Sequence, residues 1–600
     1  MTEVTGAAGL RTVALIKQVP LGDHSGHLDE QGRLRRAGLA TEMNPWCRRA
    51  VTQAVDLAKG GGHSTVVTMG PPQARDVLRE ALACGADAAI HVSDPVLAGA
   101  DCLITSRALT GAIRELGGVD VILVGRSSVD GSTGAIGPMV AELLGLPFTG
   151  PALNLSVEDD HKGPRAHCSL QLEGASEDTI VTLPAVVSVA ERSCRPAKAP
   201  AADWPDPARI RSIGAGELGG GIAGTDSPTR VVGTVETPRT RQRTMLTGEP
   251  GEQVTELIDQ MRNDRGPGAA RTVEVRSPRA VGLGPRVLVL AASGREEGTR
   301  ALLHSAAKLA GQVGGRVVVA LADAAETDFV SWAADEVVVL DGDEPRQIAA
   351  ALGSWLGDGD LPWAVLGGTS EREREVLGRL GARLGVGLMS DLIDVTTRRS
   401  AEGGSRLLGL KPSGNGVLAE IECVRIPQIA AVRTGNLELP PFGEPRAVPV
   451  STLPVLPDPR ITRSGRKADD DYDALERAEV VIGVGSGVDP ADYELLEELR
   501  VLLGAEFAAT RKVTDAGWLP HARQVGITAR SIAPRCYLAL GISGSMNHLS
   551  GLARAETILA VNSDPAAPIF AHADVGIVAD WREIVPLLAI GLARRSQTSA

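Results

Sequence analysis

The sequence predicts an α/β protein with two related open parallel-sheet domains and a third α/β domain of different design. Continuous apolar, β-branched runs bounded by glycine alternate with stretches of helical periodicity along most of the 600 residues. Such runs are typical of parallel strands that are buried on both faces. The same order of features occurs twice, about 240 to 275 residues apart, which indicates a duplication.

Each copy is expected to contain strands and helices in alternation and to end in a strand built around a proline. In the first copy the elements lie within Val13–Ile16, Ser64–Gly70, Ala74–Cys84, Gly85–Val92, Asp120–Gly125 and Leu183–Val189. In the second copy they lie within Val287–Leu290, Thr299–Gly311, Arg316–Leu321, Ala334–Leu340, Ala364–Gly368 and Ile426–Val432. Each copy should therefore form an open α/β domain of its own.

Composition shifts predict where the domains end. Pro, Gly, Arg and Asp become frequent between about residues 192 and 285, which is typical of a linker. Within it, Glu252–Met261 has apolar residues at helical spacing and could pack on another domain. The expected division is a first domain over 1–195, an arm and linker over 196–285, a second domain over 286–440, a hinge over 441–470 and a third domain over 471–600.

The third domain has two glycine-rich turns, each after an apolar strand and before a helix: Gly483–Gly487 and Gly541–Gly544. Glycine lets a phosphate approach backbone amides, and the start of a helix favours an anion. Either turn alone also fits an ordinary strand-to-helix connection. The pattern G-x-G-x-x-G from Gly483 is not completed, because its last position is Val488. An ordinary Rossmann dinucleotide site is therefore not expected.

Composition excludes several other functions. A net charge of −13 argues against nucleic-acid binding, which needs a basic surface, and the 15 aromatic residues are few for base stacking. The seven cysteines form no cluster at metal-ligand spacing, so no metal site is expected. No apolar stretch reaches the length of a transmembrane helix, and the N-terminus does not read as a signal peptide. We expect a soluble, cytoplasmic protein without an integral membrane segment.

Several stretches of the third domain carry a resemblance to a known family. They are Ala509-Thr-Arg-Lys-Val-Thr-Asp-Ala-Gly-Trp518, Gln524-Val-Gly-Ile-Thr528, Gly541-Ile-Ser-Gly-Ser-Met-Asn-His548 and Val561-Asn-Ser-Asp-Pro-Ala-Ala-Pro-Ile-Phe570. In these the chain resembles the FAD domain of the electron transfer flavoprotein α subunit, which has a flavodoxin- or Rossmann-like fold.

The resemblance extends over nearly the whole chain. Residues 287–435, with Arg425-Ile-Pro-Gln-Ile-Ala-Ala-Val-Arg433, look like the N-terminal domain of the same α subunit. Residues 12–265 are similar to the β subunit in Ile16-Lys-Gln-Val-Pro20, Met43-Asn-Pro-Trp-Cys47, Leu78–Asp87 and Asp130–Glu142. The chain thus resembles a fusion of both subunits, which would replace the family's heterodimer and make the first two domains nucleotide-binding in type.

The resemblance implies one FAD in the third domain. It places the Thr528 hydroxyl at flavin N5, the Arg511 guanidinium near the isoalloxazine ring and His548 at the O2 edge. A fixed cation in a poorly solvated site stabilises electron density on the ring and raises its potential. Taken alone, Arg511 also fits a surface ion pair and His548 a helix-terminal histidine. The other implied contacts are Ser543 and Asn547 near the cofactor's chain, Asn562 and Asp580 near the adenosine end, and Ser486, Gly487, Thr510, Gln524, Val525, Gly526, Gly541 and Gly544.

The resemblance also implies a nucleotide in the first domain. This would be AMP in an ordinary carrier, or a second FAD in the electron-bifurcating branch of the family. The candidate contacts are Asn44, Gly70, Asp130, Thr133, Gly134 and Gly137. From the residues alone, the turn before the helix also fits a simple helix cap.

Four positions depart from the family pattern. Ser486 replaces an arginine and Ile527 a glutamine, which predicts weaker or differently tuned FAD binding. Ala135 replaces a glutamine, so AMP would depend mainly on backbone amides. Ser193 stands where the partner-recognition loop has a leucine anchor, which favours a specialised redox partner over an acyl-CoA dehydrogenase.

The sequence therefore predicts an FAD-containing electron carrier rather than a substrate-turnover enzyme. It would pass electrons from a flavoprotein dehydrogenase-type donor to a quinone-linked or other acceptor. One alternative is a bifurcating flavoprotein with a second FAD and NADH as donor. Another is a redox-inactive nucleotide-binding scaffold, against which the joint presence of Arg511, Thr528 and His548 speaks.

Overall fold

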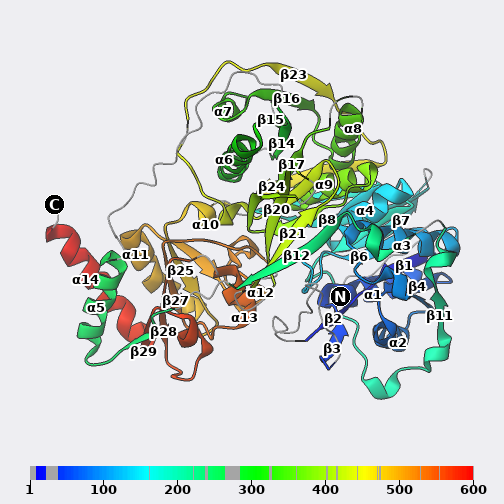
Figure 1. Cartoon of the computed structure of the whole chain (residues 1–600). Helices are drawn as coiled ribbons and strands as arrows, with labels where there is room; N and C mark the ends of the chain where they lie inside the picture. Colours follow the sequence, from blue (N-terminus) through cyan, green and yellow to red (C-terminus); the bar gives the residue numbers. More distant parts are fainter. Residues whose placement is uncertain are drawn as a thin grey trace. The chain divides into compact units, whose positions relative to one another are not determined.

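In a computed structural model, the chain forms two compact units (Figure 1). The structure describes residues 9–598, apart from 22–37, 161–162, 220–221, 237–240, 264–283, 293, 323, 325–326, 358, 360, 401–402, 414–416, 442, 469–470, 472–473, 527–528 and 553–554. The first unit holds both repeated domains. The second unit holds the third domain together with residues 236–275 from the middle of the chain.

The first domain is built on a ten-stranded sheet with the order β11-β5-β4-β1-β6-β10-β7-β8-β9-β24. Strands β11 to β7 in this order are parallel, and β7, β8, β9 and β24 pair antiparallel. The strands are β1 Arg11–Leu15, β4 His63–Met69, β5 Ala88–Val92, β6 Val121–Gly125, β7 Phe148–Asp160, β8 Gly163–Leu172, β9 Ala175–Thr182, β10 Ala185–Val189, β11 Ile210–Ile213 and β24 Ile461–Ala468. The helices are α1 Pro45–Ala58, α2 Arg75–Ala83, α3 Cys102–Leu116 and α4 Ile136–Leu144, and a small hairpin pairs β2 Gln18–Pro20 with β3 Thr41–Met43.

The second domain has a seven-stranded parallel sheet with the order β18-β22-β17-β14-β15-β16-β23. Its strands are β14 Arg286–Ala291, β15 Arg316–Leu321, β16 Glu336–Asp341, β17 Ala364–Gly367, β18 Met389–Leu392, β22 Gln428–Val432 and β23 Val450–Pro454. Its helices are α6 Glu296–Val313, α7 Thr327–Ser331, α8 Pro345–Gly357 and α9 Glu371–Leu384. The inner order β16-β15-β14-β17-β22 matches β5-β4-β1-β6-β10 of the first domain. The prediction of two related open parallel-sheet domains is confirmed.

The third domain has a six-stranded parallel sheet with the order β13-β29-β28-β27-β25-β26. Its strands are β25 Val480–Val484, β26 Glu506–Ala509, β27 Cys536–Leu540, β28 Thr557–Asn562, β29 Val575–Val578 and, from the middle of the chain, β13 Thr244–Leu246. Its helices are α10 Ala474–Arg477, α11 Tyr493–Leu503, α12 Arg511–Asp515, α13 Met546–Leu549, α14 Trp581–Thr598 and α5 Pro250–Asn263. Counted along the domain from β25, the strand order is 2-1-3-4-5, which is that of flavodoxin-like folds.

Residues 196–285, expected as an arm and linker, contribute strands to three sheets. β11 joins the first domain, and β12 Thr229–Glu236 joins a separate sheet with β19 Asp394–Arg399, β20 Ser405–Pro412 and β21 Val417–Cys423. β13 pairs with β29, and α5 packs against α14. Helix α5 is the amphipathic helix predicted from the sequence, and its apolar face is buried in the core of the third domain.

The segment 441–470, expected as a hinge, contains two strands of the first unit. β23 pairs with β16 of the second domain, and β24 pairs with β9 of the first domain. Between them Asp458 accepts hydrogen bonds from Arg346 Nη1 at 2.6 Å and Arg460 Nη2 at 3.0 Å. β23 and β24 are edge strands whose residues are mostly exposed. Such strands are held largely by backbone pairing, so they need no continuous apolar run and the sequence does not reveal them.

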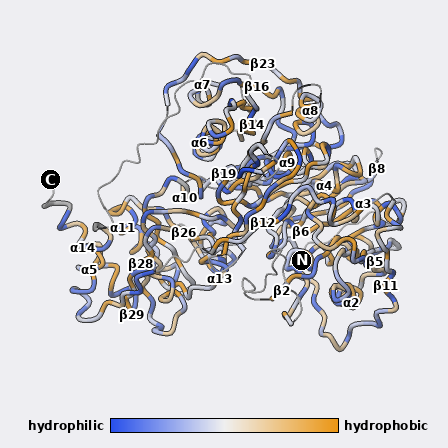
Figure 2. The backbone as a smooth tube through the Cα atoms, in the orientation of Figure 1, coloured by the Kyte–Doolittle hydropathy of each residue, from blue (hydrophilic) through white to orange (hydrophobic). Residues whose placement is uncertain are grey.

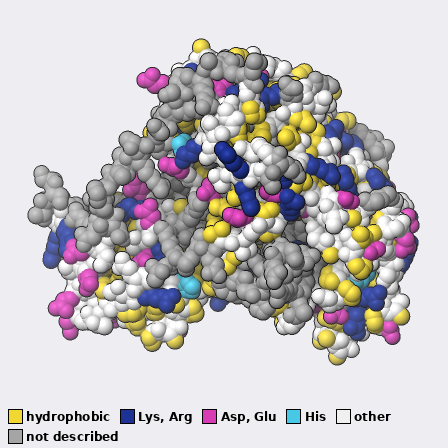
Figure 3. Space-filling model, in the orientation of Figure 1, with side chains coloured by type: hydrophobic (Ala, Val, Ile, Leu, Met, Phe, Trp, Pro, Cys, Tyr) yellow, Lys and Arg dark blue, Asp and Glu magenta, His cyan; other side chains and the backbone are white. Residues whose placement is uncertain are grey.

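Hydrophobic residues concentrate in the strands of the three parallel sheets and on the helix faces that cover them (Figure 2). Charged side chains of both signs are interspersed with hydrophobic ones on the face drawn in Figure 3. No helix of the described residues combines the length and the apolarity that crossing a bilayer requires.

The two domains of the first unit meet through buried charges. Arg379 on α9 is 0% exposed. Its Nε donates to Glu375 at 2.9 Å, and its Nη1 lies 3.2 Å from Glu142 Oε2 of the first domain. Arg126 of the first domain also pairs with Glu371 at 2.5 Å. An unpaired charge in such a place is costly, so the pairing fixes how these two domains fit together.

Replacing Arg379 by Met should destabilise the first unit strongly, because Glu142 and Glu375 would lose a buried cation. We expect the free energy of unfolding to fall by about 3 kcal/mol, measured by urea denaturation. Arg398→Met is the matched control, since Arg398 is 47% exposed and lies 4.0 Å from Glu420. It should change stability by less than about 0.5 kcal/mol. Equal effects of the two variants would contradict this account of the interface.

Asp458 should make stability depend on pH at acidic values. Burial opposes its ionisation, but the hydrogen bonds from Arg460 and Arg346 outweigh burial and lower its pKa to about 2. Because the folded pKa is below the unfolded one, the stabilisation is complete above about pH 4 and is lost as the pH falls towards 2. Asp458→Asn should therefore cost about 1 to 2 kcal/mol at pH 7 and progressively less below pH 4, measured by chemical denaturation at each pH. A difference that does not shrink with acid would refute the assignment.

Candidate functional site

The third domain places both glycine-rich turns at one edge of its sheet. Residues 485–487 follow β25, and residues 541–544 follow its neighbour β27. Because β25 lies between β26 and β27, the order of the strands reverses here, and a topological switch point lies between the carboxyl ends of β25 and β27. Ligands of doubly wound sheets bind at this switch point.

The two turns are locked to each other through their backbones. Gly485 N donates to Leu540 O at 2.9 Å, and Gly487 N donates to Gly541 O at 3.2 Å. A Cβ on Gly485 would lie 2.0 Å from Gly541 O, and Gly541 has a φ of +60°. Only glycine permits this approach, so the glycines of the two turns are required by their contact with each other.

The other predicted FAD contacts that the structure describes lie at this same edge. Thr510 and Arg511 follow β26, Asn562 ends β28, and Asp580 follows β29. Three polar residues and one glycine there are exposed: Ser486, Ser543, Asn547 and Gly487. Thr528 and its neighbour Ile527 lie outside the described residues. The edge therefore supplies a glycine surface, hydroxyls, an amide and a cation, which fits a dinucleotide cofactor such as FAD.

Several of these predicted contacts brace the turns. Gln524 is 1% exposed, and its Oε1 lies 2.7 Å from the Thr514 hydroxyl on α12. Asn562 Nδ2 donates to Ile542 O at 2.8 Å, and its Oδ1 accepts from Asp564 N at 2.9 Å. Their side chains fix the positions of the turns, and Val525 and Gly526 contribute backbone.

Gly526 and Gly544 are required by close packing. Gly526 has a φ of +144°, and a Cβ there would lie 2.5 Å from Asn547 O. Gly544 has a φ of +87°, and its Cβ would lie 2.3 Å from Ile569 N. Each glycine holds one turn against the next segment of the edge.

His548 is buried, with 4% of its surface exposed. Its Nδ1 lies 3.0 Å from Val525 O and its Nε2 lies 2.9 Å from Tyr537 Oη. Burial lowers the pKa of His548 to about 4, although the Val525 carbonyl opposes the shift. The imidazole is therefore neutral near pH 7.

Arg511 keeps its charge accessible at this edge. Its side chain is 42% exposed, and Nε lies 3.2 Å from Asp515 Oδ2 one helical turn along α12. An ion pair that exposed contributes little to stability.

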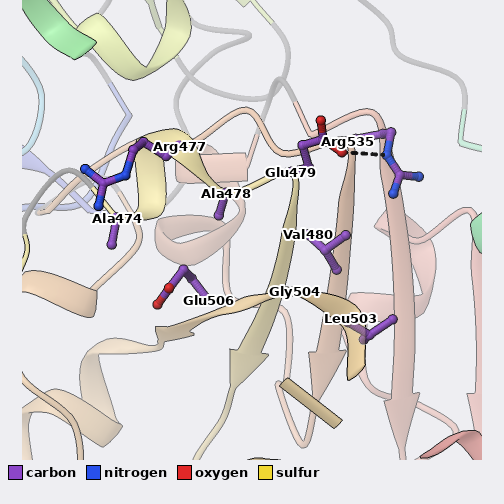
Figure 4. A pocket seen from close by; sticks show the side chains of 9 residues that line it. All are labelled: Ala474, Arg477, Ala478, Glu479, Val480, Leu503, Gly504, Glu506 and Arg535. Carbon is purple, nitrogen blue, oxygen red and sulfur yellow. Dashed lines mark ion pairs between the residues drawn. The ribbon is translucent and has the colours of Figure 1, made fainter. Parts of the chain in front are cut away.

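A separate cavity of about 390 Å³ lies at the opposite edge, where β25 and β26 begin (Figure 4). Its lining includes Arg477 and Arg535, with Glu479 and Glu506. The glycine-rich turns follow the carboxyl ends of β25 and β27, so this cavity does not belong to the candidate FAD site.

The first domain forms a second candidate site at the switch point between β1 and β6. Lys17 follows β1, and Asp130 lies in the turn after β6. Lys17 Nζ pairs with Asp130 Oδ1 at 2.7 Å. Asn44 is 0% exposed and braces the turn, because its Nδ2 donates to Ser127 O at 2.8 Å and its Oδ1 accepts from Val129 N at 3.2 Å.

The second domain holds the same turn from the other side. Ser390 Oγ donates to Thr133 O at 2.9 Å, and Lys411 Nζ donates to Gly131 O. Burial lowers the pKa of Lys411, while Asp391 opposes the shift. The turn is thus shaped by both domains of the first unit.

The three glycines predicted for this site have different roles. Gly134 has a φ of +62°, and a Cβ there would lie 3.1 Å from Arg374 Cδ. Gly137 lies in α4 with its Cα against Phe148, where a Cβ would come within 2.7 Å of the ring. Gly70 follows β4, and its carbonyl oxygen lies 3.0 Å from His91 Nε2.

Sequence reasoning did not select Lys17, Ser390, Lys411 or Tyr537 as site residues. Lys17 could have been found from the sequence, because it closely follows the first strand, and the switch point lies at the end of that strand. Ser390 and Lys411 belong to another domain, and the sequence does not tell which side chains cross a domain interface. Tyr537 lies in an apolar strand, where it resembles any core residue. Among the described residues, no three His, Cys, Asp or Glu side chains are grouped to hold a metal ion.

The fold and these two sites define a nucleotide-binding α/β protein with a flavodoxin-like C-terminal domain. The electron transfer flavoprotein domain model matches residues 32–210 and again residues 287–458, and the electron transfer flavoprotein FAD-binding domain model matches residues 474–553. The matches to the first model cover more than half of the chain, which therefore belongs to the electron transfer flavoprotein family. Two copies of one domain ahead of an FAD-binding domain fit a fused chain, as predicted.

Individual relatives agree with this assignment. Electron transfer flavoprotein subunit alpha of Mycobacterium leprae is 34% identical over 303 residues, which is 50% of this chain and 87% of the relative. The protein of that name from Bacillus subtilis is 32% identical over 270 residues, 44% of this chain and 81% of the relative. Protein FixB of Bradyrhizobium diazoefficiens is 31% identical over 242 residues, 39% of this chain and 64% of the relative.

Proposed function

We propose that the chain is an FAD-containing electron carrier between a flavoprotein dehydrogenase-type donor and a downstream redox acceptor. The observation that supports this most strongly is the pair of glycine-rich turns that bind each other at the switch point of the third domain. The FAD-binding domain match falls on the same residues and supports it. FAD would supply the electron-accepting and electron-donating chemistry.

Different residues of this edge would contact different parts of FAD. The turns at 485–487 and 541–544 would receive the phosphate chain, because their residues Ser486, Gly487 and Ser543 are exposed. Asn547 and Asp580 lie further along the edge as polar contacts. Gln524 and Asn562 would keep the turns in place through the hydrogen bonds described above.

Arg511 would place a positive charge beside the ring. A cation there favours negative charge on the ring, so it raises the reduction potential. Its side chain is 42% exposed, which supports a charge that a cofactor at this edge could meet. Thr528, two residues after Gly526, stays the proposed hydrogen-bond partner of the ring.

In the first domain we propose an AMP at the turn after β6, held mainly by backbone groups of residues 130–134. Lys17 would provide the countercharge for a phosphate if its pairing with Asp130 were exchanged. The shaping of this turn by Ser390 and Lys411 supports a site that needs both domains in place.

The donor is proposed to be a redox protein other than an acyl-CoA dehydrogenase. In the loop after β10, Ser193 and Cys194 are only partly exposed, and Cys194 Sγ lies 3.6 Å from Arg49 O of α1. A small polar side chain at that position offers a partner little apolar area.

The purified full chain should release one FAD and one AMP per chain on denaturation, measured by its visible spectrum and by chromatography of the released nucleotides. Two FAD per chain would instead support the bifurcating alternative, with NADH as a donor to be tested next. Absence of flavin, with no uptake when FAD is supplied, would overturn the carrier function and leave a nucleotide-binding scaffold.

Arg511→Ala should lower the midpoint potential of the bound FAD by on the order of 40 mV, because a nearby positive charge is removed. The measurement is a potentiometric titration with redox dyes. Arg500→Ala is the matched control, since Arg500 lies near the other edge of the same domain and pairs with Glu497 at 2.7 Å. An unchanged potential in Arg511→Ala, or the same shift in both variants, would refute the placement of this charge.

A further inference from the structure

Three segments of the third domain meet at the His548 imidazole. Tyr537 comes from β27, Val525 from the turn after the 521–523 segment, and His548 from α13, which follows the second glycine-rich turn. A carbonyl oxygen only accepts hydrogen bonds, so the contact with Val525 O requires the proton on Nδ1. Nε2 then carries a lone pair, and the Tyr537 hydroxyl donates to it.

The Tyr537 hydroxyl is confined to this position. Its side chain is 0% exposed, and the ring centroids of Tyr537 and His548 lie 5.9 Å apart with the planes tilted by 51°. On the neighbouring strand β25, a Cβ on Gly483 would lie 1.9 Å from the hydroxyl oxygen. Glycine at this strand position is needed to admit the hydroxyl, and burial raises the pKa of Tyr537, so the hydroxyl stays a donor.

His548 in turn joins the Val525-Gly526 turn to the segment that follows the second glycine-rich turn. Its Nδ1 binds the carbonyl of Val525, and the next residue, Gly526, packs directly on the backbone of Asn547 and His548. A Cβ on Gly551 would lie 2.5 Å from Gly526 N, so this turn is enclosed on a second side. Loss of the imidazole contact would remove one of the bonds that hold the Val525-Gly526 turn.

We propose that Tyr537 is a positioning residue that holds His548 as the neutral Nδ1–H tautomer, so that His548 clamps the Val525-Gly526 turn onto the second glycine-rich turn. The proposal rests on the proposed function, because Val525, Gly526 and the second glycine-rich turn are among the proposed FAD contacts. In this arrangement both imidazole nitrogens bind protein groups. Charge near the ring then comes from Arg511, while His548 controls the shape of the site.

The test uses the full-length protein labelled with [¹⁵N]histidine, with and without FAD. Long-range ¹H–¹⁵N NMR correlations distinguish a protonated ring nitrogen from an unprotonated one, and His548→Gln identifies the His548 signals by their loss. We expect a protonated Nδ1 and an unprotonated Nε2 in the wild type, unchanged between pH 6 and 8. An Nε2–H tautomer or an imidazolium in that range would overturn the proposal.

Tyr537→Phe removes only the hydroxyl and keeps the ring. We expect the Nε2 resonance to move, a second tautomer to appear, and FAD to bind about fivefold more weakly, the effect of one lost hydrogen bond. Tyr493→Phe is the matched control, because Tyr493 packs on the opposite face of the same sheet. It should leave the His548 signals and FAD affinity as in the wild type.

The outcomes separate this proposal from the proposed function. An unchanged His548 spectrum in Tyr537→Phe, or the same change in Tyr493→Phe, would overturn the positioning role even if FAD binds normally. If Tyr537→Phe does not fold, the tautomer of His548 in the wild type decides: an Nδ1–H tautomer supports the proposal and an Nε2–H tautomer overturns it. Failure of the wild type to bind FAD would instead defeat the carrier function, while the tautomer of the FAD-free protein would still report on the clamp.

Discussion

Parallel strands that are joined through helices must all end at one edge of their sheet, and the candidate sites of this protein follow from that constraint. In the third domain it brings together turns that are far apart in sequence, from Ser486 to Asp580. The strand order 2-1-3-4-5 then places the switch point between β25 and β27, where two glycine-rich turns touch. Because each turn needs glycine to accommodate the other, the sequence pattern and the geometry of the edge have the same cause.

The three domains use this edge differently. In the first domain, Lys17 and Asp130 meet at it across the switch point. In the second domain the corresponding position after β17 is occupied by the chain's own Glu373, whose Oε1 accepts from Gly368 N at 2.6 Å. A Cβ on Gly368 would lie 2.5 Å from Glu373 Oε2, so the carboxylate fills the space and disfavours an anion. The second copy contributes instead through Lys411 and Ser390, which shape the turn of the first.

Much of the fold could be predicted from the sequence, because strands buried on both faces are continuous apolar runs. β12, β23 and β24 could not, since their side chains form no continuous buried run and their strands are held by backbone pairing with partners distant in sequence. The location of the site was predictable from the glycine-rich turns. The direction of individual side chains was not, because an amide such as Asn44 or Gln524 suits both a ligand and a buried turn.

The role of Tyr537 shows the same limit at a single residue. In the sequence it is one member of an apolar strand, and its hydroxyl acquires a partner only because Gly483 on the adjacent strand leaves room for it. The pairing joins residues 483, 537, 548 and 525, which no local pattern connects. Side-chain chemistry of this kind depends on the register of neighbouring strands, which tertiary structure alone supplies.

The connectivity of the chain gives the third domain a further property. The second unit takes its helices and strands from two distant parts of the chain, β13 and α5 in the middle and the segment from β25 to α14 near the end. β13 pairs with β29, and Arg241 forms a largely buried ion pair with Asp574 at 2.7 Å. In separate subunits such a segment would have to be captured from solution, whereas within one chain its effective concentration is fixed by the linkers. Fusion therefore makes the segment from the first half a permanent part of the domain proposed to carry FAD, whatever the protein concentration.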